Sequence, residues 1–358
     1  MSQHHKEGGP VRAAILEAPQ RLVVQDTSEP QRGDGEVLVA VEVAGVCGSD
    51  VPVFQGTRPV SYPLILGHEA IGRVVDSGGD GLAEGTRVVV EPNIPCGVCA
   101  VCQRGRGNVC PNKRSLGLNR PGAFADRVVV PAGFVHPVPT DVALQDAVGL
   151  EPLAVAVHAF SLGAAAEGES VAIIGCGTEG LLLMQVAAAM GARVLAADMR
   201  EERLAAAERL GAARTLKVPV DESPEAVGSR MQADWSPGVV FECAGAAPAV
   251  ELALNAVAIG GRIVLIGLAA KPVPVIPLRF VRRGLSLLGS LIYDHPTDFA
   301  RAIDLVRTGR VHPSALVTDV HDLERASTAV ELVVAGQSGK VLLDIAGVLG
   351  GGTNATTA

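Results

Sequence analysis

A glycine-rich turn between an apolar strand and an apolar helix most constrains how this chain can fold. Residues 170–180 read SVAIIGCGTEG, so Gly175, Gly177 and Gly180 follow a buried-strand pattern and open a helical one. In such a turn the first glycine makes the bend, the second lets backbone approach a pyrophosphate, and the third lets the helix pack closely. Free N–H groups at the helix start favour the phosphates. The turn therefore predicts a dinucleotide-binding βαβ unit.

An acid at the end of the next strand strengthens this prediction, because glycine-rich turns alone are common. Asp198 ends the strand VLAAD, 18 residues after Gly180, where a carboxylate is expected to bind the adenosine ribose. That carboxylate would repel a 2′-phosphate, so we expect NAD rather than NADP. Arg200, two residues further on, either softens this preference or stacks on the adenine.

Strand and helix patterns alternate along the second half of the chain, from about Leu153. The apolar strands read SVAIIG, ARVLAAD, GVVFECA and RIVLIG, with alanine-rich helical segments between the first of them. This alternation predicts a doubly wound parallel sheet. Residues 11–90 instead show short strands between glycine and proline turns, which is typical of a small β-rich barrel or sandwich. The late helix HPTDFARAIDLVRTG and the final strand KVLLDI need partners, which the β-rich part would supply.

We therefore predict an α/β protein with two domains, since 358 residues exceed what one typical core supports. The predicted β-rich domain is discontinuous and consists of residues 1–153 and 294–358. Residues 154–293 form the predicted nucleotide-binding domain. The last residues, 346–358, are expected to be a floppy tail.

Charge and hydropathy exclude several classes of partner. The net charge is −8 and no long basic run occurs, which argues against nucleic acid. No stretch of 18 apolar residues is free of charge, which argues against a membrane span. The first residues, MSQHHKEGGP, lack the apolar region of a signal peptide. We expect a cytoplasmic protein, in which clustered cysteines indicate metal or redox chemistry rather than disulfides.

Four of the seven cysteines lie in one short loop. The segment CGVCAVCQRGRGNVC has the spacing C-x2-C-x2-C-x7-C and consists of Cys96, Cys99, Cys102 and Cys110. Four thiolates at short spacing suit tetrahedral Zn2+ and leave no position for water, so a closed structural site is expected. The alternatives are unconnected core cysteines or an iron–sulfur centre, which uses other spacings.

A third candidate site is dispersed along the chain. Cys47 lies in AGVCGSD, His68 and Glu69 lie in LILGHEA, and Glu151 lies in VGLEPLAV. Each alone is more often structural than catalytic. However, Glu151 lies in an apolar stretch where an unpaired carboxylate would be costly. One metal ion between the two domains, beside a bound nicotinamide, would account for all four residues.

Together these sites resemble the zinc-dependent medium-chain dehydrogenases of the alcohol dehydrogenase superfamily, over roughly residues 11–345. The similarity is greatest to the sorbitol (polyol) and threonine dehydrogenase branch. It implies a GroES-like catalytic domain around an inserted Rossmann domain, and two zinc ions per chain. It also implies a homodimer or homotetramer joined through the Rossmann sheet edge, where RIVLIG and LSLLGSLI would supply apolar surface.

The resemblance implies a role for each dispersed residue. Cys47 and His68 match the thiolate and imidazole ligands of the catalytic zinc. Glu69 and Glu151 match the acids that complete its coordination, one of them through water or in exchange with water. Asp50 matches the acid that orients the imidazole.

Ser49 matches the hydroxyl that binds the substrate alcohol and accepts its proton. The family often has a proton-relaying histidine where this chain has Pro52, so the relay would run through ribose hydroxyls and water. Ile292 stands where polyol enzymes carry an arginine, just before Tyr293. Phe54 and Leu118 are further candidates for the pocket. These apolar residues favour a secondary alcohol less hydroxylated than sorbitol, with cyclic alcohols among the candidates.

The sequence thus predicts an NAD-dependent zinc alcohol dehydrogenase that acts on a small-molecule alcohol or ketone. The first alternative is a true polyol or amino-alcohol dehydrogenase. The alternative from outside the enzymes is a structural or sensor protein that binds NAD and is stabilised by zinc. A protein of that kind would not need the set Cys47, Ser49, His68 and Glu69.

Overall fold

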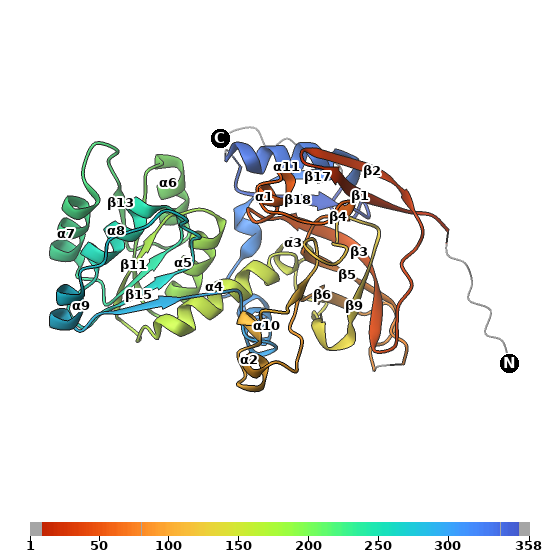
Figure 1. Cartoon of the computed structure of the whole chain (residues 1–358), viewed down its shortest axis with the longest axis horizontal. Coiled ribbons are helices and arrows are strands. Elements are labelled where there is room, and N and C mark those ends of the chain that lie inside the picture. Colours follow the sequence, from red (N-terminus) through yellow and green to blue (C-terminus); the bar gives the residue numbers. More distant parts are fainter. Residues whose placement is uncertain (1–8, 80, 337, 351–358) are drawn as a thin grey trace. The chain divides into compact units, whose positions relative to one another are not determined.

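The structure, a computed structural model, describes residues 9–79, 81–336 and 338–350 (Figure 1). The chain forms two compact units. The first unit runs to Glu151 and resumes at Pro313, and the second runs from Pro152 to His312. The sequence had placed residues 294–312 with the β-rich part, whereas the structure groups them with the second unit.

The first unit is built on a seven-stranded sheet. Its order is β10-β6-β5-β3-β18-β17, with β9 also paired to β3. The strands are β3 (Glu36–Val46), β5 (Glu69–Asp76), β6 (Arg87–Val90), β9 (Arg127–Pro131), β10 (Val135–Pro137), β17 (Val317–Asp322) and β18 (Lys340–Asp344). Among the described strands of this sheet, β17 and β18 pair in parallel and the other pairs are antiparallel. Because Val341 of β18 lies opposite Val46 of β3, the two ends of the chain meet in one sheet.

Smaller elements complete this unit. A second sheet has the order β2-β1-β4, and a short ribbon joins β7 to β8. The remaining bounds are β1 (Val11–Ala18), β2 (Arg21–Thr27), β4 (Leu64–Ile65), β7 (Asn93–Ile94), β8 (Arg114–Ser115), α1 (Asp50–Phe54), α2 (Ala100–Gln103), α3 (Leu144–Ala147), α11 (Ala326–Ala335), η1 (Gly107–Val109), η2 (Ala132–Phe134), η3 (Pro313–Leu316) and η4 (Leu323–Arg325). Alternate residues of β3, such as Val37, Val39 and Val41, enter one core with Leu343 of β18. This period-two burial is what a half-buried sheet requires.

The second unit contains a six-stranded parallel sheet of order β13-β12-β11-β14-β15-β16. Its strands are β11 (Ser170–Ile174), β12 (Arg193–Asp198), β13 (Arg214–Lys217), β14 (Val239–Glu242), β15 (Arg262–Leu265) and β16 (Ser286–Gly289). Its helices are α5 (Thr178–Ala189), α6 (Glu201–Arg209), α7 (Pro224–Trp235), α8 (Ala247–Ala256), α9 (Pro277–Arg283) and α10 (Thr297–Arg307), preceded by α4 (Leu150–Gly163). The order reverses between β11 and β14, as in a doubly wound fold. The predicted fold class, a β-rich domain combined with a Rossmann-type sheet, is confirmed.

Two further expectations concern the ends and the membrane. The expected tail starts at residue 346, yet the N–H groups of Val348 and Leu349 both donate to the Asp344 carboxylate, at 2.9 Å each. Residues 351–358 lie outside the described ranges. No helix within those ranges is long and apolar enough to cross a bilayer.

Candidate active site

Strand pairing brings Cys47, His68 and Glu69 together in the first unit. Cys47 directly follows β3, His68 directly precedes β5, and Gly45 of β3 lies opposite Glu69 in the antiparallel pairing. The sulfur, a ring nitrogen and a carboxylate oxygen of these three residues lie within 4.8 Å of one another. Thiolate, imidazole and carboxylate at this spacing are the donor set of a catalytic zinc site. The residues present therefore fit the metal that the sequence implies.

Ser49 and Asp50 lie against the same imidazole. The Ser49 hydroxyl is 3.2 Å from Nε2 of His68 and 3.4 Å from Sγ of Cys47. Asp50 is buried; its Oδ1 is 3.2 Å from Nδ1 of His68, and its Oδ2 accepts the N–H of Cys47 at 3.0 Å. A carboxylate on Nδ1 leaves Nε2 to face the metal position, which is the usual support for a ligating histidine.

The charges around His68 shift its pKa. Burial is the largest single influence and lowers the pKa, but the charge of Asp50 and that of Cys47 together raise it well above its ordinary value. Anionic neighbours that stabilise the protonated imidazole also favour a bound metal cation, because the same negative potential stabilises either positive charge.

A buried lysine that the sequence analysis missed pairs with Glu69. Lys340, the first residue of β18, forms a short ion pair with the Glu69 carboxylate, and its Nζ also donates to the carbonyl of Val46 at 3.1 Å. Burial lowers the pKa of Lys340, but Glu69 and Cys47 raise it overall. A side chain on Gly45 would collide with the Glu69 carboxylate. One signal was available: a lysine opens KVLLD, a strand that is otherwise nearly all apolar.

Glu151 lies in the first turn of α4 and is buried. Its charge contributes to the raised pKa of Lys340, so it belongs to the same neighbourhood. Its carboxylate is not part of the group formed by Cys47, His68 and Glu69. The structure therefore brings three of the four predicted ligands together at ligand spacing.

The four clustered cysteines converge in the first unit. Their sulfurs are 3.5 Å (Cys99–Cys102), 3.6 Å (Cys96–Cys110), 3.9 Å (Cys99–Cys110) and 4.0 Å (Cys96–Cys102) apart. Thiolates about 2.3 Å from one tetrahedral Zn2+ would lie roughly 3.8 Å from each other. The N–H groups of Val98 and Cys99 lower the pKa of Cys96 to about 6. The geometry fits a four-cysteine zinc site.

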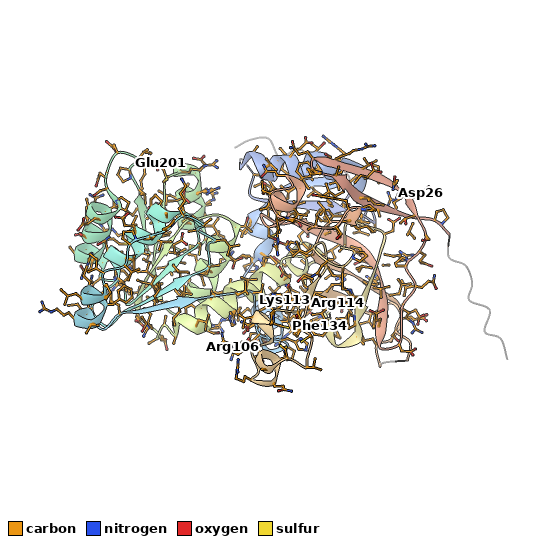
Figure 2. All side chains as sticks on the ribbon, in the orientation of Figure 1. Asp26, Arg106, Lys113, Arg114, Phe134 and Glu201 are labelled. Atoms are coloured by element: carbon orange, nitrogen blue, oxygen red, sulfur yellow. The ribbon has the colours of Figure 1, made fainter. Side chains whose placement is uncertain are left out.

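Basic residues lie within this cysteine loop and directly after it. Figure 2 labels Arg106, Lys113 and Arg114. Nζ of Lys113 donates to the carbonyl of Asn108 in η1 at 3.1 Å, which ties the segment after Cys110 to the loop. Burial lowers the pKa of Lys113.

The glycine-rich turn has the shape that a dinucleotide needs. Gly175 adopts φ +94°, and a Cβ on Gly180 would lie 1.9 Å from the Gly175 carbonyl, so the helix packs directly on the turn. A Cβ on Gly177 would meet nothing within 4 Å. Helix α5 begins at Thr178 without a side-chain cap, which leaves its first N–H groups for an anion.

Asp198 ends β12 beside this turn. Its Oδ2 accepts the N–H of Cys176 at 2.7 Å, and its Oδ1 accepts the N–H of Arg200 at 2.9 Å. The Arg200 side chain instead forms an ion pair with Glu202 at 2.8 Å. Asp198 therefore links the glycine-rich turn after β11 to the end of β12.

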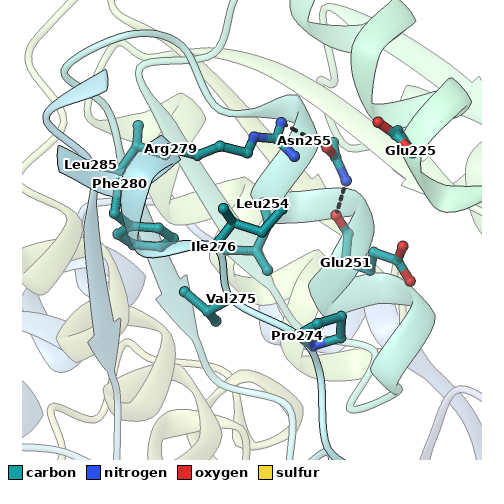
Figure 3. A pocket seen from close by; sticks show the side chains of 10 residues that line it. All are labelled: Glu225, Glu251, Leu254, Asn255, Pro274, Val275, Ile276, Arg279, Phe280 and Leu285. Atoms are coloured by element: carbon teal, nitrogen blue, oxygen red, sulfur yellow. Dashed lines mark hydrogen bonds between the residues drawn. The ribbon is translucent and has the colours of Figure 1, made fainter. Parts of the chain in front are cut away.

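The predicted pocket residues divide between the two units. Phe54 is buried in the core of the first unit, and Leu118 packs against that core. In the second unit, Ile292 adopts a left-handed backbone (φ +46°), and the buried Tyr293 ring packs edge-on against Phe299 at 4.8 Å. A cavity of about 150 Å³ between α8 and α9 contains none of the predicted site residues (Figure 3).

Two models of known protein families match this chain, one in each unit. The family model described as "Alcohol dehydrogenase GroES-like domain" matches residues 33–140, and that described as "Zinc-binding dehydrogenase" matches residues 180–308. Sorbitol dehydrogenase of Bacillus subtilis is 30% identical over 90% of this chain and 93% of its own length.

Two solved structures have the same fold. A putative zinc-binding dehydrogenase from Sinorhizobium meliloti bound to NADP has a TM-score of 0.87, 32% identity, and coverage of 94% of this chain and 100% of its own. A structure from Escherichia coli CFT073, described as a short chain alcohol dehydrogenase complexed with NADH, has a TM-score of 0.87, 30% identity and the same coverage. This chain thus belongs to the zinc-dependent medium-chain dehydrogenases, near their polyol branch, and is an oxidoreductase acting on CH–OH donors.

Proposed function

We propose that this protein is an NAD-dependent, zinc-dependent dehydrogenase of a secondary alcohol and its ketone, acting in the cytoplasm. The observation that carries the proposal is the convergence of Cys47, His68 and Glu69 within 4.8 Å, with the Ser49 hydroxyl on Nε2 of His68. A structural or sensor protein would not need this arrangement of donor atoms around one hydroxyl.

Each residue of the site has a proposed task. Cys47 and His68 would hold the catalytic zinc, and Glu69 or Glu151 would complete its coordination. Zinc bound there would supply Lewis-acid chemistry that lowers the pKa of an alcohol. Ser49 accepts the hydroxyl proton of the substrate and passes it outward.

Asp50 fixes the His68 ring through Nδ1. Pro52, in the middle of α1, has no group that relays a proton. A proton taken up by Ser49 would therefore have to leave through water, or through ribose hydroxyls if a bound cofactor supplied them. Cys96, Cys99, Cys102 and Cys110 would hold a second, structural zinc.

We propose NAD as the cofactor, which would accept hydride from the alcohol carbon. The fit of Gly175, Gly177 and Gly180 to a pyrophosphate supports dinucleotide binding. The Asp198 carboxylate, at the end of β12, supports NAD over NADP because it would repel a 2′-phosphate. The pairing of Arg200 with Glu202 supports this preference, since that guanidinium is partly neutralised.

For the substrate, we propose a secondary alcohol less hydroxylated than sorbitol. The support is Ile292, which precedes Tyr293 where a polar side chain would be expected for a polyol, together with Phe54 and Leu118. The second candidate is a polyol, and the 30% identity to a sorbitol dehydrogenase favours it.

Turnover measurements distinguish these candidates. Zinc-replete protein would be assayed for NAD+ and NADP+ reduction with sugar alcohols and with cyclic and aliphatic secondary alcohols. We expect turnover with NAD+ and the less polar set. Ser49→Ala should lower kcat about 10²- to 10⁴-fold with unchanged zinc content, because the proton acceptor is lost. Preference for hexitols would establish the second candidate, and full activity of Ser49→Ala would remove Ser49 from the mechanism.

We also propose that the protein is a homodimer or homotetramer joined at the β16 edge of the second unit. Large apolar side chains are exposed on and near this edge. They are Val275, Ile276, Leu278, Val281, Leu287 and Leu291. Two of them, Val275 and Ile276, also line the cavity beside α9 (Figure 3). Apolar patches of this kind beside an unpaired sheet edge are typical of subunit interfaces.

A further inference from the structure

Glu242 is a buried acid in the second unit to which the proposed mechanism gives no task. It ends β14, and its side chain is 0% exposed. Oε1 accepts the N–H of Gly245 at 2.8 Å, but Oε2 has no hydrogen-bond partner among the described residues. Burial raises the pKa of Glu242, and the N–H groups of Gly245, Ala244 and Ala246 oppose this shift. No described lysine, arginine or histidine contributes to it. A buried carboxylate without a cation is costly, which makes its presence here informative.

The carboxylate lies where three strands end. A Cβ on Gly267, in the loop after β15, would come within 2.7 Å of Oε2. The Glu242 carbonyl accepts the N–H groups of Ile266 and Gly267 at 2.9 Å each. Gly175 of the glycine-rich turn packs against Ala244, two residues after Glu242. The carboxyl group is therefore enclosed by the loops that follow β11, β14 and β15.

The position of these loops indicates which half of the cofactor they face. A dinucleotide binds outside the carboxyl ends of the strands, across the point where the strand order reverses. That point lies between β11 and β14. Because Asp198 on β12 marks the adenosine side, the nicotinamide half falls on the side of β14 and β15. This step rests on the proposed NAD-dependent function. The oxidised nicotinamide ring carries one positive charge, which reduction removes.

We propose that Glu242 sets the relative affinity of this protein for the oxidised and reduced cofactor. Its carboxylate supplies a fixed negative charge beneath the nicotinamide half, which stabilises the cationic ring of NAD+ and not the neutral ring of NADH. Two unit charges within roughly 10 Å, at an effective dielectric constant near 20, change such a ratio by about tenfold.

The test compares Glu242→Gln with the wild-type, zinc-loaded full chain. The dissociation constants of NAD+ and NADH would be measured calorimetrically at pH 8.5, since burial raises the pKa of Glu242 and alkaline pH favours its ionised form. The neighbouring thiols stay protonated there, because burial raises the pKa of Cys176 to about 12 and that of Cys243 well above its ordinary value. We expect the variant to lose about tenfold in affinity for NAD+ and less than twofold for NADH. Glu251→Gln, which removes an acid of α8 beside the outer cavity in Figure 3, should change neither constant.

Equal losses for NAD+ and NADH would overturn the inference, because Glu242 would then only hold the loops in place. Failure of wild-type protein to bind either form would instead overturn the proposed function. Should Glu242→Gln not fold, the inference is tested on the wild-type protein instead. The ratio of its dissociation constants for NADH and NAD+ would then be measured between pH 5 and pH 9. The preference for NAD+ must fall as Glu242 protonates, and a ratio that does not change with pH would contradict the inference. Glu179 is the other acid beside Cys243, and Glu179→Gln provides the control for its titration.

Discussion

At the scale of single residues, the candidate site depends on one buried lysine. Lys340 contacts both segments that carry the proposed ligands: the Val46 carbonyl, which precedes Cys47, and the Glu69 carboxylate, which follows His68. Both members of the Lys340–Glu69 pair are almost fully buried. Removing one partner leaves a buried charge uncompensated, which costs much more than losing an exposed ion pair.

We expect Lys340→Met to lower the free energy of unfolding of the first unit by about 3–5 kcal/mol. Chemical denaturation would measure it. Adding Glu69→Gln should recover part of the loss, because the orphaned charge is then gone. Lys271→Met, at an exposed lysine, is the control and should stay within about 0.5 kcal/mol of wild type. A Lys340→Met variant as stable as this control would show that water or rearrangement compensates Glu69.

A second residue-scale prediction separates two glycines of one turn. Gly180→Ala should destabilise the second unit by about 1–3 kcal/mol, because the new Cβ would collide with the Gly175 carbonyl. Gly177→Ala should leave stability unchanged, since its Cβ meets no protein atom. It should still weaken NAD binding by crowding the pyrophosphate. Thermal unfolding and cofactor titration on both variants check this, and equal stability of the two would contradict the close helix packing.

At the scale of elements, the cysteine loop has almost no apolar core of its own. Helix α2 and η1 are only four and three residues long, and α2 contains no buried residue. Four sulfurs at metal spacing are therefore the main internal constraint on this loop. Metal binding to such a segment is coupled to its folding.

We expect Cys99→Ser to reduce bound zinc from two ions to one per chain and to make the segment between Cys96 and Cys110 sensitive to proteolysis at Arg104 or Arg106. Elemental analysis and limited digestion with trypsin would measure this. Cys243→Ser, at a cysteine outside both proposed zinc sites, should keep two ions. A Cys99→Ser protein that retains two zinc ions and resists trypsin would contradict a structural role for the metal.

The elements also show which parts of the structure could be predicted from the sequence alone. Strands β11, β12, β14 and β15 were predictable because each is a short apolar run bounded by turn residues. Cys47, His68 and Glu69 were predictable as candidates from their motifs, but their proximity follows from the register of β3 and β5. The partner of Glu69 was not predictable, because Lys340 reaches it only through the pairing of β18 with β3. Glu242 was not predictable as a site residue, because in the sequence it is one acid at the end of the apolar strand GVVFECA.

At the scale of the whole molecule, a group of exposed large apolar side chains between Val275 and Leu291 lies on and near one edge of the second unit. Val281 is 81% exposed, Leu278 60% and Leu287 39%, the last on the edge strand β16. An edge strand with apolar neighbours tends to pair with another chain.

We expect the wild-type protein to have the mass of a dimer or tetramer in light scattering. The double variant Val281→Asp/Leu287→Asp should be a monomer, because two charges would be buried in the interface. Val220→Asp, on a residue of the same unit that is 83% exposed, is the matched control and should keep the wild-type mass. A double variant that still associates would place the interface elsewhere. A monomeric wild-type protein would exclude such an interface.

The pairing of β18 with β3 also has a consequence for how the protein is made. The ribosome synthesises β3 early, but its neighbour β18 begins only at Lys340, after the whole second unit has been translated. Domains fold as they emerge, so the second unit can mature while the first still lacks the two strands β17 and β18. During that interval the Glu69 carboxylate has no cation and one side of β3 has no partner. The half of the molecule that carries the proposed catalytic metal is thus the first to be started and the last to be finished.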